Sequence, residues 1–256
     1  MRNLILLLIL IACKNVKDEK VFVSIYPLKL VLNEISVNSE AIIENPLDIH
    51  SFEPSIKKIL NAQNSCAFIY ISDNFETWAK NIKAKYKLKL LQSEQNPHIW
   101  TNPTFILNNL DKIEDILLKC KISYEKQKLI ELKEKLKSID SLNKIYSKDV
   151  KKSFILFHTS FEPFLRHYNL KIEAILLKEG HGDILPSDLE KALNSKDKIL
   201  IVESYYSEQM LKPFIKNNFK IISIDPLGTN FKNYTEFIKF ISESILLNKY
   251  VLKENL

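Results

Sequence analysis

Glycine is nearly absent from this sequence, with 3 occurrences in 256 residues. Loops that cradle phosphate groups are rich in glycine, because the missing side chain lets the backbone approach the phosphate closely. Neither the GxGxxG pattern of dinucleotide sites nor the GxxxxGK(S/T) pattern of triphosphate sites occurs. The sequence therefore argues against chemistry driven by a bound nucleotide.

A block of like charges is also missing. The 37 Lys and Arg residues face 31 Asp and Glu residues, for a net charge of +6, and most lysines stand in mixed-sign stretches such as EKQKLIELKEKLK. Such stretches are typical of solvated helix faces, whereas nucleic-acid-binding proteins concentrate basic residues on one surface. We therefore expect no nucleic-acid partner, and the 46% hydrophobic and 27% charged residues indicate a globular protein.

An apolar run of nine residues, 4–12, follows the charged N-terminus. It is too short to span the roughly 30 Å hydrocarbon layer of a bilayer, but it suits a secretory signal peptide. The run closes on Leu-Ile-Ala-Cys, which resembles a bacterial lipobox, so we expect a signal peptide over residues 1–12, a lipidated Cys13 and a polar tether over residues 13–20. An ordinary signal peptide with a chance cysteine is the alternative. The lipid would anchor the exported protein to a membrane, on its periplasmic or extracellular face.

Two further cysteines remain after Cys13. Cys66 lies in the apolar, strand-like run SCAFIYIS, and Cys120 ends a helical stretch. In an exported protein the two could form a disulfide, but two buried free thiols are an equally good interpretation. The sequence leaves this choice open.

Short apolar runs alternate with amphipathic stretches along most of the chain, which predicts an α/β fold with parallel sheets covered on both faces. In the first half, a strand running into a helix is expected in KVFVSIYPL, further strands in AIIE, CAFIYIS and KLKLLQ, and helices in PSIKKILNAQ and NFETWAKNIKAK. In the second half, the expected strands are SFILFH, LKIEAILL, KILIVES and FKIISID, and the chain closes on the helix NYTEFIKFISESILLNKYVL.

Helical spacing also predicts a helix over residues 104–119 and one long helix over residues 123–149, which contain neither proline nor glycine. We therefore expect two lobes, an N-terminal β/α lobe over residues 21–120 and a C-terminal β/α lobe over residues 151–256, joined by a long helix within residues 121–150. Ligands of such sheets bind beyond the carboxyl ends of the strands, which places the site at the lobe interface.

Four metal-ligating side chains follow predicted strands. His50 and His98 come after strands of the first lobe, and His158 and Asp225 end strands of the second. The 48, 60 and 67 positions that separate them match no local zinc motif, so each ligand would come from a different loop. Three imidazoles and one carboxylate form a complete tetrahedral set for zinc, although any one such histidine alone is more often structural.

Other residues have secondary roles in this interpretation. Glu203 ends a predicted strand and would either orient a ligand histidine or accept backbone hydrogen bonds. Trp100 and Phe161 are expected to be walls of the pocket. His167 is expected to cap its helix or face solvent, and His181, in a glycine-containing loop, to be structural.

At these residues the chain resembles the zinc- and manganese-binding lipoproteins of bacterial ABC transporters, the cluster A-I or cluster 9 substrate-binding proteins. The resemblance covers the whole mature chain and rests on FVSIYPLKLVLNEI, DIHSFEPS, NPHIWTNP, FILFHTSFEPFLRHYNL, IVESYYSEQ and IDPLGTN. The motif around the second histidine usually reads Asp-Pro-His-x-Trp-x-Asp-Pro in that family. Asn96 and Asn102 depart from it, and the sequence does not explain them.

The resemblance implies two lobes joined by a rigid helix, with the metal held between them by His50, His98, His158 and Asp225. It implies capture of Zn²⁺ outside the cytoplasmic membrane and delivery to an ABC permease and its ATPase, by a monomer. Manganese-selective relatives usually have a glutamate at the position of His158, and three nitrogens favour Zn²⁺. The His-rich loop of some zinc-specific relatives is absent between His50 and His98.

Three alternatives remain. The same fold could import manganese or iron. A zinc hydrolase would need an open coordination position for water, which four protein ligands do not leave, so we expect no enzyme. A surface adhesin, a role ascribed to some relatives, has no particular residue in its favour.

Overall fold

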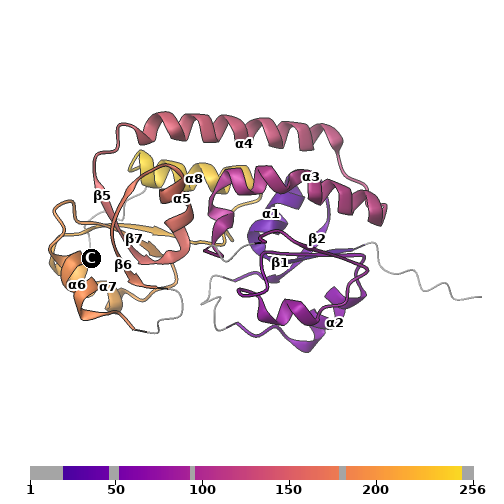
Figure 1. Ribbon diagram of the computed structural model, residues 1–256, viewed down its shortest axis with the longest axis horizontal. Coiled ribbons are helices and arrows are strands. Elements are labelled where there is room, and N and C mark those ends of the chain that lie inside the picture. Colours follow the sequence, from indigo (N-terminus) through magenta and orange to yellow (C-terminus); the bar gives the residue numbers. More distant parts are fainter. Residues whose placement is uncertain (1–19, 46–51, 93–95, 179–182, 250–256) are drawn as a thin grey trace, which may run out of the picture.

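The computed structural model describes residues 20–45, 52–92, 96–178 and 183–249 (Figure 1). These residues form two α/β lobes side by side, each built on a parallel four-stranded sheet. Long helices cover one side of both lobes. The strand order is β2-β1-β3-β4 in the first lobe and β6-β5-β7-β8 in the second. The predicted fold class is confirmed.

Both sheets are built around a strand that is buried along its whole length, β1 in the first lobe and β5 in the second. Parallel strands covered on both faces consist of continuous apolar residues, which explains VFVSI and SFILFH. The first lobe contains β1 (Val21–Ile25), β2 (Ser39–Ile43), β3 (Ala67–Tyr70) and β4 (Tyr86–Lys89). The second contains β5 (Ser153–His158), β6 (Lys171–Leu177), β7 (Ile199–Glu203) and β8 (Lys220–Ile224).

Helices connect the strands and cover the sheets. The first lobe contains α1 (Tyr26–Glu34), α2 (Ile56–Asn64) and α3 (Pro103–Cys120), with the short 3₁₀ helices η2 (Thr77–Asn81) and η3 (Ile99–Thr101). The second contains η4 (Thr159–Phe161), α5 (Glu162–His167), α6 (Pro186–Leu193), α7 (Glu208–Lys216) and α8 (Tyr234–Leu246). Between the lobes runs α4 (Lys126–Ser147), the longest helix of the described residues.

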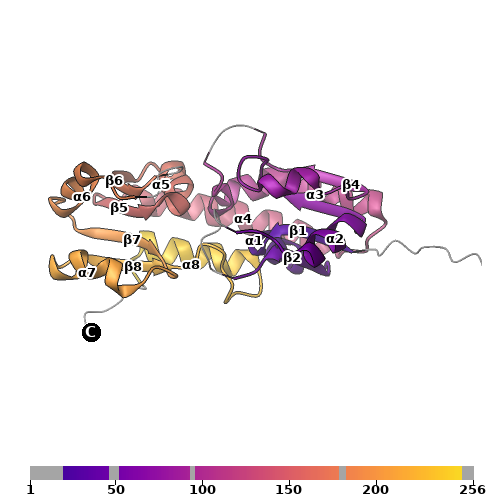
Figure 2. The same ribbon diagram turned by 90° about the horizontal axis from the view of Figure 1, so that it is seen from below.

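Helix α4 lies across the top of both lobes, with α3 and α8 beneath it (Figures 1 and 2). It begins three residues later and ends two earlier than the predicted 123–149. Its buried face follows the helical spacing, through Leu129, Leu132, Leu136 and Ile139. The prediction of one long helix joining the lobes is confirmed.

The two lobes share one hydrophobic core. Side chains of the first sheet, of α4 and α8, and of one face of the second sheet belong to a single buried cluster. In β5, Phe154 and Leu156 face this shared core, while Ile155 and Phe157 face a smaller cluster on the other side of the sheet. Moving the lobes apart would expose apolar surface to water, which favours a fixed lobe arrangement.

The predicted helix over NFETWAKNIKAK is wrong. Only the short η2 forms there, because side chains draw the segment into a tight connection between β3 and β4. The buried carboxylate of Glu76 accepts hydrogen bonds from the backbone N–H groups of Ile71 (3.1 Å) and Ser72 (2.8 Å). From β4, the Lys87 ammonium donates to the carbonyl of Ala79 at 2.5 Å.

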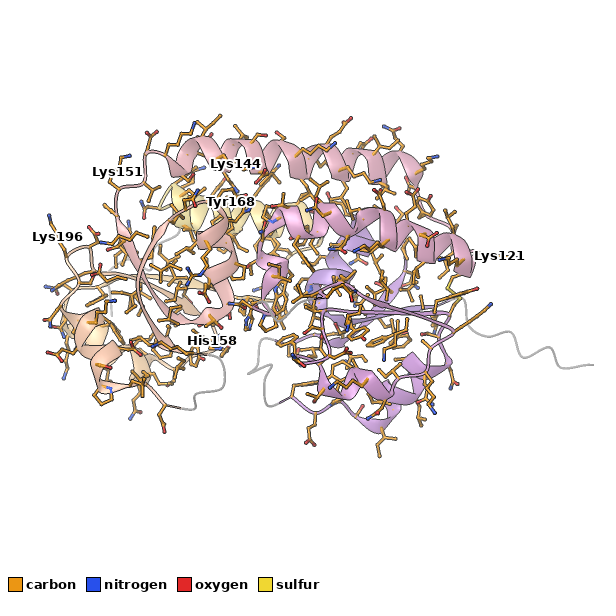
Figure 3. All side chains as sticks on the ribbon, viewed as in Figure 1. Lys121, Lys144, Lys151, His158, Tyr168 and Lys196 are labelled. Carbon is orange, nitrogen blue, oxygen red and sulfur yellow. A yellow bond between two sulfur atoms is a disulfide. The ribbon has the colours of Figure 1, made fainter. Side chains whose placement is uncertain are left out.

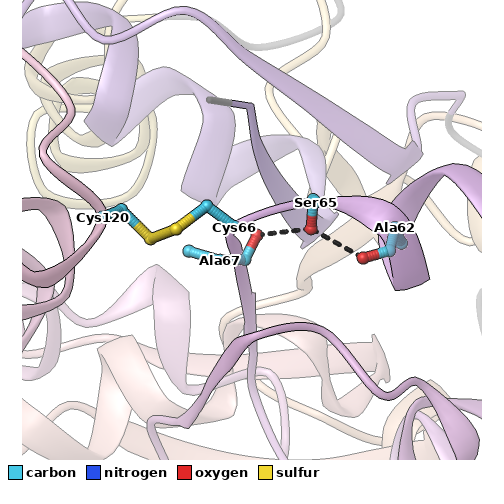
Figure 4. Close-up of a disulfide and its surroundings, with 5 residues drawn as sticks. All are labelled: Ala62, Ser65, Cys66, Ala67 and Cys120. Carbon is cyan, nitrogen blue, oxygen red and sulfur yellow. Dashed lines mark hydrogen bonds between the residues drawn. A yellow bond between two sulfur atoms is a disulfide. The ribbon is translucent and has the colours of Figure 1, made fainter. Parts of the chain in front are cut away.

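Cys66 and Cys120 form a disulfide, which decides between the two alternatives that the sequence left open (Figure 4). Their Cα atoms are 5.8 Å apart, and both residues are buried. The bond ties the last residue of α3 to the residue before β3. The predicted signal peptide, tether and Cys13 lie outside the described residues, and no helix within the described ranges has the length and apolarity to cross a bilayer.

Candidate metal site

His98 and His158 meet at the interface of the lobes. His98 precedes η3 in the loop between β4 and α3, and His158 is the last residue of β5. Their ring centroids are 5.1 Å apart with the ring planes nearly perpendicular, at 84°. Both are buried, at 1% and 7% exposure, and Figure 3 shows His158 on the side of its lobe that faces the other lobe. The prediction that these two histidines lie close together is therefore seen in the structure.

Both imidazoles have an oxygen next to Nδ1. The Nδ1 of His98 lies 3.0 Å from Oδ1 of Asn96. The Nδ1 of His158 lies 3.1 Å from Oγ of Ser160 and 3.6 Å from Oε1 of Glu203. Such partners at one ring nitrogen are the usual means of orienting a histidine whose other nitrogen binds a metal.

Glu203 is buried, at 1% exposure, and neither of its carboxylate oxygens has a hydrogen-bond partner among the described residues. Of the two roles expected for Glu203, accepting backbone hydrogen bonds is therefore not observed among the described residues. Burying a carboxylate is costly unless a positive charge faces it. The ring of His158 is the neighbouring group, so Glu203 is placed to stabilise a positively charged or metal-bound imidazole.

Asp225 directly follows β8 and organises the loop after it. Its Oδ1 accepts a hydrogen bond from the N–H of Leu227 at 2.9 Å, and its Oδ2 accepts from the N–H and hydroxyl of Thr229, each at 2.6 Å. Each carboxylate oxygen can accept two bonds, so Oδ1 keeps capacity for a further partner. Among the described residues, no three His, Cys, Asp or Glu side chains are grouped to hold a metal ion. His50 and His181 lie outside these residues.

Trp100 forms a wall beside His98 and also ties the lobes together. Its ring centroid lies 5.1 Å from that of His98. Its indole N–H donates to the carbonyl of Pro226 at 2.8 Å, and its own carbonyl accepts from the hydroxyl of Tyr234 at 2.6 Å. The loop of His98 is thereby linked to the residue that follows Asp225. Phe161 is fully buried in the shared core.

Phe75 is a neighbour that the sequence did not indicate. Its ring centroid lies 5.6 Å from that of His98 and 5.4 Å from that of Trp100. It stands directly before the buried Glu76, in the segment expected to be helical. Because that segment was expected to be helical, nothing in the sequence placed Phe75 beside His98.

His167 does not have the solvent-facing or capping role expected for it. Its Nε2 lies 2.7 Å from Oδ1 of Asp140 on α4 and 2.9 Å from Oγ1 of Thr104 on α3. Burial tends to raise the pKa of Asp140, but its hydrogen bonds with Lys144 and His167 outweigh burial and hold that pKa below its usual value. His167 therefore belongs to a polar network beneath α4, which joins residues far apart in the sequence.

Three comparisons with known proteins agree with this architecture. AdcA of Streptococcus pneumoniae (strain ATCC BAA-255 / R6), a zinc-binding lipoprotein, is 27% identical over 212 residues, which cover 66% of this chain and 42% of AdcA. The high-affinity zinc uptake protein ZnuA of Bacillus subtilis (strain 168) is 25% identical over 169 residues, covering 52% of this chain and 52% of ZnuA. The chain thus spans about half the length of these curated relatives.

The crystal structure of AdcAII from Streptococcus pneumoniae has the same fold, with a TM-score of 0.71 at 20% identity over 88% of this chain and 98% of that one. The family described as ZnuA, zinc-uptake complex component A, periplasmic, matches residues 21–246. Its members are solute-binding components of transporters. The match covers nearly all of the described residues, so the chain belongs to the ZnuA family.

Proposed function

We propose that this protein is an exported zinc-binding protein that captures Zn²⁺ and delivers it to the permease of an ABC importer powered by a separate ATPase. The observation that carries the proposal is the contact of His98 and His158 across the lobe interface, with ring centroids 5.1 Å apart. Two oriented, buried imidazoles from different lobes suit a borderline metal ion such as zinc.

The complete ligand set in this proposal is His50, His98, His158 and Asp225. Three neutral nitrogens and one carboxylate favour Zn²⁺ over the harder Mn²⁺, while manganese or iron uptake is the alternative. Glu203 and Trp100 do not bind the metal in this proposal. Glu203 stabilises the ring of His158, and Trp100 packs beside the ring of His98. With four protein ligands, no coordination position is left for a catalytic water, so we propose no enzymatic role.

The names of the relatives support the proposed cargo and location. AdcA is a zinc-binding lipoprotein, and the family is described as periplasmic. We propose that Cys13 carries the lipid anchor, that residues 21–120 and 151–256 form the two lobes, and that residues 121–150 join them. Because a ligand imidazole must be neutral, acid should release the metal, and docking on the permease would release it by disturbing one lobe.

Metal stoichiometry measured on the purified protein tests the proposal. The wild type should bind one Zn²⁺ per chain, and His98→Ala and His158→Ala should lose it. His167→Gln is the matched control, because it removes a partly buried imidazole that is engaged by Asp140 and Thr104, and it should keep the metal. Competition with Mn²⁺ distinguishes the two metals.

Two results would overturn the proposal. One is a wild-type protein, folded by circular dichroism, that binds no zinc after reconstitution. The other is zinc binding that survives the loss of His98 and of His158. Preference for Mn²⁺ in the competition would replace the cargo but keep the site.

A further inference from the structure

Asn96 joins the two histidine loops across the lobe interface. Its amide nitrogen Nδ2 donates to the carbonyl of Thr159 and to Oε2 of Glu162, each at 3.0 Å. Its Oδ1 accepts the backbone N–H of His98 at 2.9 Å and lies 3.0 Å from the Nδ1 of the same residue. One half of the side chain thus binds the His98 loop, and the other half binds the residue after His158.

These contacts fix which way the amide group points. A backbone N–H can only donate, and a carbonyl can only accept. The N–H of His98 therefore requires Oδ1 on its side, and the carbonyl of Thr159 requires Nδ2 on its side. Both amide hydrogens and both oxygen lone pairs have a partner, so no flipped arrangement satisfies the same contacts.

The orientation of Asn96 in turn fixes the tautomer of His98. Since Oδ1 is an acceptor, the Nδ1 of His98 must carry the hydrogen. A neutral imidazole then has its lone pair on Nε2, which is the form that binds a metal through Nε2. Asn96 therefore holds His98 in a ligand-competent form and, through Thr159, holds it at a set position relative to His158.

A carboxylate could not make the same bridge. It has no hydrogen to donate, so it would meet the carbonyl of Thr159 as a second acceptor. It would also meet the carboxylate of Glu162, whose other oxygen, Oε1, binds Arg166 at 2.6 Å. Like charges at hydrogen-bonding distance repel each other strongly in a partly buried site. An asparagine at position 96 is thus matched to a glutamate at position 162.

We propose that Asn96 is a positioning residue that preorganises the His98–His158 pair for the metal, by bridging the Nδ1 of His98 to Thr159 and Glu162 of the other lobe. This inference rests on the proposed function, because it assumes that the two histidines bind metal. It explains one of the two departures from the family motif. The other, Asn102, accepts hydrogen bonds from the N–H and hydroxyl of Thr104 at the start of α3 and makes no hydrogen bond with a histidine among the described residues.

Zinc affinity of paired variants tests the bridge. Asn96→Asp should weaken binding by about 10- to 100-fold, the range found when a residue that orients a metal ligand is changed. Adding Glu162→Gln should restore most of the loss, because the new amide can donate to the carboxylate at position 96. Glu162→Gln alone should bind as wild type, since its amide oxygen still accepts from Asn96.

Asn102→Asp is the matched control, since the same chemical change falls in the same octapeptide. Aspartate caps a helix as well as asparagine does, so zinc affinity should not change. An Asn96→Asp variant that binds zinc as tightly as wild type, or one that Glu162→Gln does not rescue, would overturn the inference.

NMR of the ring nitrogens of His98 in the metal-free protein shows which nitrogen carries the hydrogen. This tautomer preference would not change if Asn96 only stabilised the fold. Wild type should show the hydrogen on Nδ1, and Asn96→Ala should lose this preference. A wild-type spectrum with the hydrogen on Nε2 contradicts the inference whether or not zinc binds. By contrast, a wild type that binds no zinc contradicts the proposed function and leaves the spectrum to decide the orientation of His98.

Discussion

The disulfide between Cys66 and Cys120 allows a stability prediction with a worked magnitude. It closes a loop of 54 residues, which holds most of the described N-terminal lobe between β3 and the end of α3. In the chain-entropy account, a crosslink stabilises the folded protein by restricting the unfolded chain, and a loop of this length corresponds to about 4 kcal/mol at 25 °C. This value is an upper bound, because native-state strain and residual structure in the unfolded chain reduce it.

The perturbation is the double substitution Cys66→Ala/Cys120→Ala, which removes the crosslink without leaving a free thiol. Urea unfolding should show a free energy of unfolding lower by about 2–4 kcal/mol than that of the oxidised wild type. The slope of the unfolding free energy against urea should rise, because the uncrosslinked chain exposes more surface when it unfolds. A reductant should destabilise the wild type but not the double variant.

Zinc binding provides a second, independent readout. The disulfide lies at the outer end of its lobe, next to Lys121, whereas His158 lies at the lobe interface (Figure 3). As long as the double variant is folded, its zinc affinity should match that of the wild type. Two free thiols in the denatured, unreduced wild type, together with equal unfolding free energies of the two proteins, would refute the reasoning.

Two further predictions concern buried carboxylates. Burial raises the pKa of Glu76 from 4.5 to about 7, so the folded protein keeps a proton that the unfolded chain releases, and the unfolding free energy should fall by about 3 kcal/mol as pH rises from 4.5 to 7. Urea titrations across this pH range should show the decrease in unfolding free energy in wild type but not in Glu76→Gln. The same pH dependence in both proteins would contradict the role of Glu76. Glu34 accepts from the N–H (3.0 Å) and hydroxyl (2.7 Å) of Thr235 at the start of α8, so Glu34→Ala should cost about 1–2 kcal/mol in the same assay. The half-exposed Glu40→Ala is its control, and equal losses in both would count against a specific role for Glu34.

The fold followed from the sequence because its signals are local. Apolar runs of strand length, separated by amphipathic segments, report burial on both faces of a sheet, and each observed strand overlaps a predicted run, although β2 and β4 begin one or two residues before theirs. The long helix was evident from the spacing of its leucines. The segment after β3 differs from its predicted helix, because Glu76 turns inward and accepts hydrogen bonds from the backbone N–H groups of Ile71 and Ser72, the two residues that follow β3.

The candidate site was predictable in part for the same reason. Side chains at the carboxyl ends of parallel strands converge, and from this rule the sequence predicts that His98 lies near His158. The pairing of Asn96 with Glu162 was beyond the sequence, because these residues are 66 positions apart and belong to different lobes. The contact of Trp100 with Pro226, 126 positions away, was hidden in the same way.

The sequence by itself determined the alternation of strands and helices and the long connecting helix, and it supplied the proposed set of metal ligands, since each depends on periodicity or on residue chemistry. Only the tertiary structure decided that Cys66 and Cys120 pair, that α8 returns to be capped by Glu34 of the first lobe, and that Asn96 bridges the histidine loops. These contacts depend on how two sheets and three long helices pack around one core. Packing of that kind is a property of the whole chain, and no short stretch of sequence records it.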